Sequence, residues 1–355
     1  MNYLYFLYIE FLAKHNIPQI VGDITFYVIP CLIIFVALLI VILALVLFER
    51  KLLGWFTQRK GPNRVGLWGV LQTIADAFKL LCKENITPTG VDRFLFNLAP
   101  ILIFVPVMIV LGLIPFSSEF TFMNFQTNLL IYMIVATMPV LSILLAGWAS
   151  NNKYSLLGAM RNVAQILAYE LPIAFTVLSI IVLASSMNLT QITLAQSSKW
   201  GVLGWFCIPC FIGLVIMFIC TLAELNRCPF DLPEAESELI CGYNTEYSGM
   251  RFALFYLSEY GMLFANALLI SVLFFGGYIS PLGRYLTSGF LVYFEQVFWL
   301  LLKTFLIIFV MIWVRATLPR MASFDLLKFS WAVLLPVSIL NLFLMVVLKF
   351  IGVWG

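Results

Sequence analysis

A third of the acidic side chains of this 355-residue chain lie in one short connection. The stretch CPFDLPEAESELICGYNTEYSGMR, residues 228–251, holds five carboxylates, and Glu224 just before it makes six of the 17 acids in the chain. Crowded or buried carboxylates bind protons more tightly than free ones and can exchange them near neutral pH. The chemistry that this stretch could perform is proton transfer, and the alternative is a solvated acidic loop.

Further ionisable residues lie in or beside apolar runs, where they are costly and usually functional. Glu170 and Glu259 are the acids of this kind, and Lys303 is the one base within such a run. Lys303 is a candidate partner for Glu259 or Glu170, although a lysine can also reach out to the membrane interface. The proton-path residues that we expect from these features are Glu170, Glu224, Asp231, Glu234, Glu236, Glu238, Glu259 and Lys303.

Two connections should hold short helices that position these groups. Asp231, Pro233 and Glu234 form a helix start of capping-box type, so a helix is predicted from Asp231 to about Cys241, stopped by Gly242. Upstream, the segment GLWGVLQTIADAFKLLCKE has an amphipathic pattern. Its polar face either meets lipid headgroups or forms one wall of a cavity, toward which the Gly61-Pro62-Asn63 turn would fold the nearby arginines.

The composition requires a membrane around these elements. The chain is 63% hydrophobic and 10% charged, with a mean hydropathy of +1.04, far from the values of soluble domains. The net charge of +3 gives no reason to expect a nucleic-acid partner. The seven cysteines are mostly isolated, so we expect no metal site. Lipid must cover most of the surface.

The fold class that we predict is an all-α, polytopic membrane protein with eight transmembrane helices and amphipathic helices in its connections. Residues 1–25 are expected to form an interfacial extension, and residues 26–355 a single transmembrane domain. Apolar runs of about 20 residues give the spans. They are residues 26–48, 94–116, 128–149, 168–187, 201–224, 252–275, 294–314 and 329–349.

Basic residues indicate the orientation of these spans. The connections after the first, third, fifth and seventh spans carry fifteen of the 20 Lys and Arg residues, whereas the other side carries four. The positive-inside rule therefore places the odd-numbered connections in the cytoplasm or the mitochondrial matrix. We call this basic side the inner side.

Four long motifs resemble NADH dehydrogenase subunit 1, which is also called the membrane H subunit of respiratory complex I. They are ERKLLGWFTQRKGPNRVGLWGVLQTIADAFKLLCKE, GWASNNKYSLLGAMRNVAQILAYE, AELNRCPFDLPEAESELICGYNTEYSGMRFALFYLSEY and WVRATLPR, and the similarity runs in order from about residue 30 to 349. One departure is that Pro319-Arg320 leads into MASFDLLKF, without the aromatic-Arg-Tyr-Asp-Gln run usual in this family.

The resemblance implies a core subunit of the proton-pumping NADH:ubiquinone oxidoreductase, without a redox centre of its own. Ubiquinone would be its substrate, while NADH, FMN and iron–sulfur clusters would belong to partner subunits of the peripheral arm; small membrane-arm subunits and lipid would be further neighbours. The acids would form the path that couples quinone reduction to proton transfer, and the resemblance implies Asp76 and Glu84 as further residues of this path. The quinone-binding residues implied are Arg50, Trp55, Arg59, Phe78, Arg227, Phe230, Arg315 and Arg320.

Two alternatives share some of these features, namely the homologous subunit of a membrane-bound hydrogenase and an independent proton or cation transporter. Paired, broken repeats typical of transporters are not visible in the sequence, and the arginine-rich first connection favours the quinone enzyme. The high Phe content and the unusual last connection favour the mitochondrial inner membrane, with a bacterial plasma membrane as the alternative.

Overall fold

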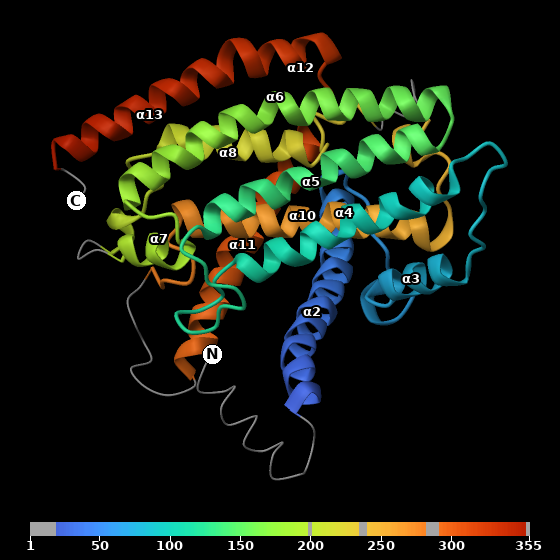
Figure 1. The fold of residues 1–355 in the computed structure, drawn as a ribbon, viewed down its shortest axis with the longest axis horizontal. Coiled ribbons are helices and arrows are strands. Elements are labelled where there is room, and N and C mark those ends of the chain that lie inside the picture. The colour runs from blue at the N-terminus through green and yellow to red at the C-terminus, as the bar shows by residue number, and fades with distance from the viewer. Residues whose placement is uncertain (1–18, 198–200, 234–239, 282–290, 353–355) are drawn as a thin grey trace.

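The computed structural model describes residues 19–197, 201–233, 240–281 and 291–352, and these residues form helices and no strands (Figure 1). Seven helical segments among them are long and apolar enough to cross a membrane, and an eighth apolar helix is shorter. The all-α, polytopic prediction is confirmed. The long helices are α2 (Gln19–Phe56), α4 (Arg93–Leu113), α5 (Asn128–Ala149), α6 (Lys153–Ala184), α10 (Gly249–Phe274), α11 (Leu291–Thr317) and the pair α12 (Ser323–Phe329) and α13 (Leu335–Phe350).

The fifth predicted span, residues 201–224, is wrong over its first ten residues. A 3-10 turn, η2 (Gly201–Gly204), precedes the short helix α8 (Phe211–Glu224). At about 1.5 Å per residue, α8 covers less than the roughly 30 Å of a hydrocarbon core. The backbone before it bonds elsewhere, because Phe206 N donates to the side chain of Gln196 and Cys207 N donates to Phe274 O. Apolar composition alone could not reveal these competing partners.

The fourth predicted span begins 15 residues too late. Helix α6 starts at Lys153, where Asn152 caps it by accepting a hydrogen bond from Tyr154 N at 3.0 Å. Its 32 residues continue from the inner connection into the membrane, so Asn162 and Gln165 are helical and buried. Polar residues lower the hydropathy of this part of the chain, so the search for apolar runs did not include it in the span.

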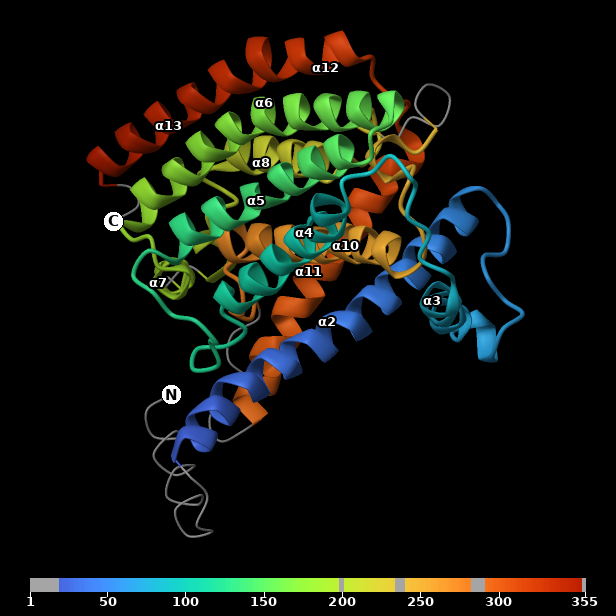
Figure 2. The same cartoon turned by 45° about the vertical axis from the view of Figure 1, so that its right-hand side comes forward.

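Helix α10 is the centre of the molecule and is the most deeply buried span. It packs against α4 on one side and α11 on another. Helices α4, α5, α6 and α13 follow one another across the molecule, with α8 against α6. Figure 1 shows α2 and α11 at a steep angle to the helices of this layer, and Figure 2 shows α3 (Gln72–Cys82) beside the end of α2. Residues on α10 can therefore reach the elements on both of its sides.

The amphipathic helix expected after the first span is present as η1 (Leu67–Gly69) and α3 (Gln72–Cys82). Gly69 has a φ of +76°, and a Cβ there would lie 2.1 Å from Pro62 O, so only glycine fits this turn. Helix α3 turns Thr73 and Asp76 toward α2, while Ile74 and Phe78 are exposed. Thr73 and Asp76 on its polar side thus point toward α2, while Lys79 remains exposed.

The remaining helices are short. They are α7 (Leu189–Ala195), η3 (Gly242–Asn244) and a π-helical turn, η4 (Ser330–Leu334), between α12 and α13. Most of the helix predicted from Asp231 to Cys241 falls in residues 234–239, outside the described residues. Residues 1–18 of the predicted extension also lie outside them, and α2 already begins at Gln19.

Candidate functional site

Two acids and two arginines form a partly buried charge cluster where α2, α10 and α11 meet the end of α8. Arg227 donates from Nη1 to both carboxylate oxygens of Glu49, at 2.7 and 2.6 Å. Its Nη2 lies 3.0 Å from Oε1 of Glu259, and Arg315 donates to Glu49 as well. The side chains of Arg227 and Glu49 are each 4% exposed, so these charges compensate one another in place of water.

Arg227 stays charged in this position. Burial alone would lower the pKa of Arg227, but the carboxylates of Glu259 and Glu49 raise it above its usual value. The ring of Tyr260 lies against the guanidinium, with 4.6 Å between Cζ and the ring centroid. Glu49 is not among the residues expected from the sequence, although an acid at the polar end of the first apolar run is a signal of this kind.

A cavity of about 490 Å³ opens between α2, α3, α4 and α10, and an ion pair lies in its wall. Arg50 Nη1 donates to Asp76 Oδ2 at 2.5 Å, and Gln72 donates to the other oxygen at 3.2 Å. Burial by itself raises the pKa of Asp76, but these hydrogen bonds hold it below its ordinary value. The remaining walls are mainly apolar and include Phe35, Leu39, Leu43, Leu80, Phe104 and Leu254. We call this space the apolar cavity.

Two tyrosines of α10 connect the apolar cavity with the charge cluster. Tyr256 lines the cavity, and its hydroxyl donates to that of Tyr260 at 3.2 Å. Tyr260 then contacts Arg227. A second connection runs along α2, where Arg50 lines the cavity and its neighbour Glu49 belongs to the cluster. A charge placed near Arg50 therefore changes the electrostatic potential at the charge cluster, because only short contacts separate the two places.

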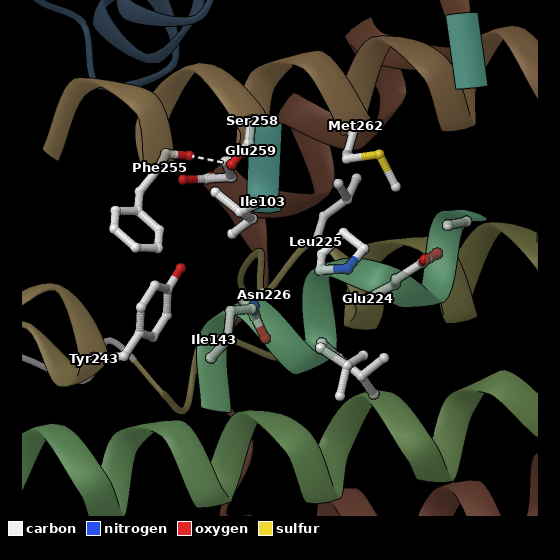
Figure 3. A pocket seen from close by; sticks show the side chains of 14 residues that line it. Ile103, Ile143, Glu224, Leu225, Asn226, Tyr243, Phe255, Ser258, Glu259 and Met262 are labelled. Carbon is white, nitrogen blue, oxygen red and sulfur yellow. Dashed lines mark hydrogen bonds between the residues drawn. The ribbon is translucent and has the colours of Figure 1, made fainter. Parts of the chain in front are cut away.

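On the far side of the cluster lies a small acidic cavity of about 50 Å³. Glu224, Asn226 and Glu259 are among the side chains around it (Figure 3). A water molecule needs roughly 10–15 Å³ of such space, so a few would fit. Glu259 belongs to both the charge cluster and this cavity, which makes it the shared residue of the two.

Buried polar atoms without protein partners lie around the acidic cavity. Among the described residues, these atoms include both side-chain polar atoms of Asn162, Oε1 of Glu170 and Oδ1 of Asn226. Asn162 and Glu170 are four residues before and after Ile166, which lines the cavity, so all three share one face of α6. Buried polar atoms normally bond to protein or ordered water, and these are placed to bond water.

Asp231 and Arg320 form a second ion pair, 3.0 Å long, between the acidic connection and the one after α11. Burial raises the pKa of Asp231, while Arg320 and Arg315 oppose this effect. Met321 N also donates to Pro229 O at 3.0 Å, so the two connections are fastened together.

Other residues expected at the site lie apart from it. Trp55, Arg59, Phe78 and Glu84 are exposed on the surface of the described chain. Phe230 is 4% exposed and packs edge-on against Tyr169, so it is part of the core. The predicted residues Glu234, Glu236 and Glu238 lie outside the described residues.

Lys303 has no carboxylate partner in the described structure, contrary to the pairing with Glu259 or Glu170 considered above. Its amine donates to three carbonyl oxygens just after α10, those of Phe275, Gly277 and Ile279, at 2.6–2.8 Å. It also lies 4.3 Å from the centroid of the Trp205 ring. Free carbonyls at the end of a helix attract a cation, and they outcompete the distant acids.

Fold and site together define a multi-pass membrane protein with paired ionisable residues inside its helix bundle. A profile of the NADH dehydrogenase family matches residues 29–346, and the chain belongs to that family. It is 44% identical to the H subunit of the NADH-quinone oxidoreductase of Brevibacillus brevis, over 91% of this chain and 93% of the relative.

Two further relatives with the same name agree with this assignment. The H subunits of Bacillus cytotoxicus and Bacillus thuringiensis are each 46% identical, over 86% of this chain and 88% of the relative. The family expected from the four sequence motifs is therefore confirmed.

Proposed function

We propose that this chain is the membrane subunit of a proton-pumping NADH:quinone oxidoreductase that receives the quinone and couples its reduction to proton transfer. Its family and its relatives, each named as the H subunit of an NADH-quinone oxidoreductase, support the enzyme. The redox work belongs to partner subunits that hold NADH, FMN and iron–sulfur clusters. This chain supplies the binding space and the proton-exchanging groups.

The observation that carries the proposal is the apolar cavity with the Arg50–Asp76 pair in its wall. A quinone has an apolar tail and a headgroup that needs hydrogen bonds, and a mainly apolar slot with a few polar groups suits both parts. The Arg50 guanidinium can donate to a headgroup oxygen and stabilise the negative charge that reduction produces. Asp76 holds the guanidinium in place.

Coupling follows from the order of the groups. Negative charge near Arg50 weakens the ion pairs between the arginines and the acids of the charge cluster, or it draws a proton toward the quinone headgroup. Tyr256 and Tyr260 lead from the cavity to Arg227, and Glu259 leads on to the acidic cavity. Glu224 lies on the wall of that cavity and can exchange protons through water there. These contacts support a proton path that responds to quinone reduction.

A substitution that fills the cavity tests the quinone site. Ala77→Phe on α3 places a ring in the apolar cavity, and we expect the KM for a long-tailed quinone to rise about tenfold, the effect of roughly 1.4 kcal/mol of lost binding. Ala75→Phe on the exposed side of α3 is the matched control. Equal KM values for the two variants in assembled enzyme would show that the quinone does not bind in this cavity.

Glu224→Gln tests the proton path. Glutamine keeps the size of the side chain but cannot take up or release a proton, so quinone-dependent proton pumping should fall at least tenfold in assembled enzyme. Pumping is measured in vesicles by the quenching of a pH-sensitive dye. Unchanged pumping would make Glu224 a structural residue.

The partners and the location complete the proposal. Peripheral-arm subunits would cover the inner side, small membrane-arm subunits and lipid would surround the spans, and ubiquinone would enter from the bilayer. The relatives named above are bacterial and do not support the mitochondrial location expected from the sequence. We place the protein in a bacterial plasma membrane, with its basic connections in the cytoplasm.

A further inference from the structure

A hydrogen-bonded chain of three side chains ends on Glu224. The hydroxyl of Tyr132 on α5 donates to Oδ1 of Asn266 on α10 at 2.9 Å. The amide nitrogen of Asn266 then donates to Oε2 of Glu224 at 3.1 Å. Tyr132 and Asn266 are 1% and 2% exposed, so water does not compete for these bonds.

The tyrosine fixes which end of the amide meets the carboxylate. An asparagine amide can present either its donor nitrogen or its acceptor oxygen. A buried tyrosine hydroxyl needs an acceptor, and Oδ1 of Asn266 provides it, which leaves the nitrogen for Glu224. A donor that faces a carboxyl group favours its ionised form, whereas an acceptor would favour the protonated form.

We propose that Tyr132 and Asn266 are positioning residues that set the proton affinity of Glu224 in the path described above. This inference rests on the proposed function. Asn266 is seven residues beyond Glu259 on α10, so the two lie on one face of this helix, and Glu259 lines the acidic cavity together with Glu224. The amide itself passes no proton, because it offers a fixed donor on one side and a fixed acceptor on the other.

Several titratable groups act on Glu224 from the surrounding elements. Glu170 faces it from α6 and Tyr132 from α5, and Cys220 is on α8 itself. Glu259 on α10 lines the same cavity. Negative charge on Glu170 or Glu259 disfavours the ionised form of Glu224. The neutral amide of Asn266 favours that form, because it donates a hydrogen bond to the Glu224 carboxylate.

The test compares pairs of variants in assembled enzyme. Asn266→Leu removes the donor, and the limb of the pH profile of pumping that Glu224 controls should move to higher pH by about one unit, the effect of one hydrogen bond to a charged group. Tyr132→Phe frees the amide to turn, so it should give a shift of the same sign. In a Glu224→Gln background neither change should move the profile further.

Matched controls separate positioning from packing. Tyr169→Phe removes another buried hydroxyl, which donates to Leu326 O at 3.0 Å, and Asn341→Leu removes another buried amide, which donates to Ser179 Oγ at 3.2 Å. These variants should leave the pH profile in place. If Asn266→Leu and Tyr132→Phe give the same pH profiles as the two control variants, the positioning role is wrong, even where Glu224→Gln abolishes pumping. If Glu224→Gln has no effect, the proton path itself fails.

Discussion

At the scale of single residues, the cluster around Arg227 shows how a membrane protein can keep a paired arginine and glutamate, Arg227 and Glu49, in its interior. Glu49 accepts hydrogen bonds from two arginines, and Arg227 also meets Glu259. The desolvation cost of such charges is offset only when every partner is in place. Loss of one member therefore leaves the others uncompensated.

Glu49→Gln should expose this dependence. The variant leaves Arg227 and Arg315 with one carboxylate, that of Glu259, and we expect a loss of stability of about 3–5 kcal/mol. The amount of assembled enzyme on native gels and its thermal midpoint should both fall. Glu246→Gln, which weakens one bond to Asn152 on the inner surface, is the control. Wild-type assembly of Glu49→Gln would contradict the structure of the cluster.

Several site residues could be predicted from the sequence because an ionisable side chain in an apolar run needs a function. Glu224 and Glu259 meet this criterion and line one cavity, whereas Arg227, which contacts Glu259, was expected only from the family resemblance. Asn266 and Tyr132 do not meet it, since neutral polar residues are common in membrane helices and only their contacts across helices distinguish them. The environment of Phe230 could not be predicted for the converse reason, because an aromatic residue in a motif says nothing about which side it faces, and only the structure shows its contact with Tyr169.

At the scale of elements, cations close the outer ends of two spans. Lys303 satisfies the carbonyls after α10, and Lys349 on α13 donates to Val182 O and Ser185 Oγ at the end of α6. A helix end in a membrane has no water to bond its last carbonyls, so these lysines do it. They fix α11 to α10 and α13 to α6.

Lys303→Met should separate this structural role from the proton path. Methionine has a similar length but no donor, so three carbonyls lose their partner and the enzyme should lose about 1–3 kcal/mol of stability. Quinone reduction and pumping per assembled enzyme should persist at low temperature. Lys328→Met, at an exposed site on α12, should change the thermal midpoint little. Loss of pumping with an unchanged thermal midpoint would instead indicate that Lys303 belongs to the proton path.

The elements could be predicted where apolar runs are long and uninterrupted. The bounds of α5 agree with the predicted span, and those of α10 and α11 differ from theirs by one to three residues at each end. The start of α6 and the length of α8 could not be predicted. In α6 a polar stretch stays helical because neighbouring helices cover it, and before α8 the backbone finds partners outside the helix.

At the scale of the whole molecule, the charges and the cavities share one side. The charge cluster lies near the ends of α2, α8 and α11, and the connections at these ends carry most of the basic residues. If α8 is counted as a crossing, α2, α8 and α11 are the first, fifth and seventh crossings, so their C-terminal ends lie on the same side. The orientation is open to a direct chemical test.

Single cysteines report the two sides of the membrane. Lys153→Cys, in the connection between α5 and α6, should react with a membrane-impermeant maleimide only in inside-out vesicles, whereas Ser197→Cys should react only in spheroplasts. Both positions are exposed. The unchanged chain, with its exposed Cys82 and Cys241, gives the background. The reverse pattern would invert the assignment of the basic side.

The π-helical turn at Ser330–Leu334 fixes the number of residues in the last span. The buried positions Leu326, Ser330, Leu334 and Ser338 recur every four residues, and on a straight α-helix each such step would drift by about 40°. The wider turn absorbs part of this drift, so Ser330 still donates to Ala168 O and Asn341 still reaches Ser179, both on α6. Loss of one codon here would rotate half of the span by roughly 100° against the other half. In evolution this segment should tolerate substitutions far more readily than changes in its length.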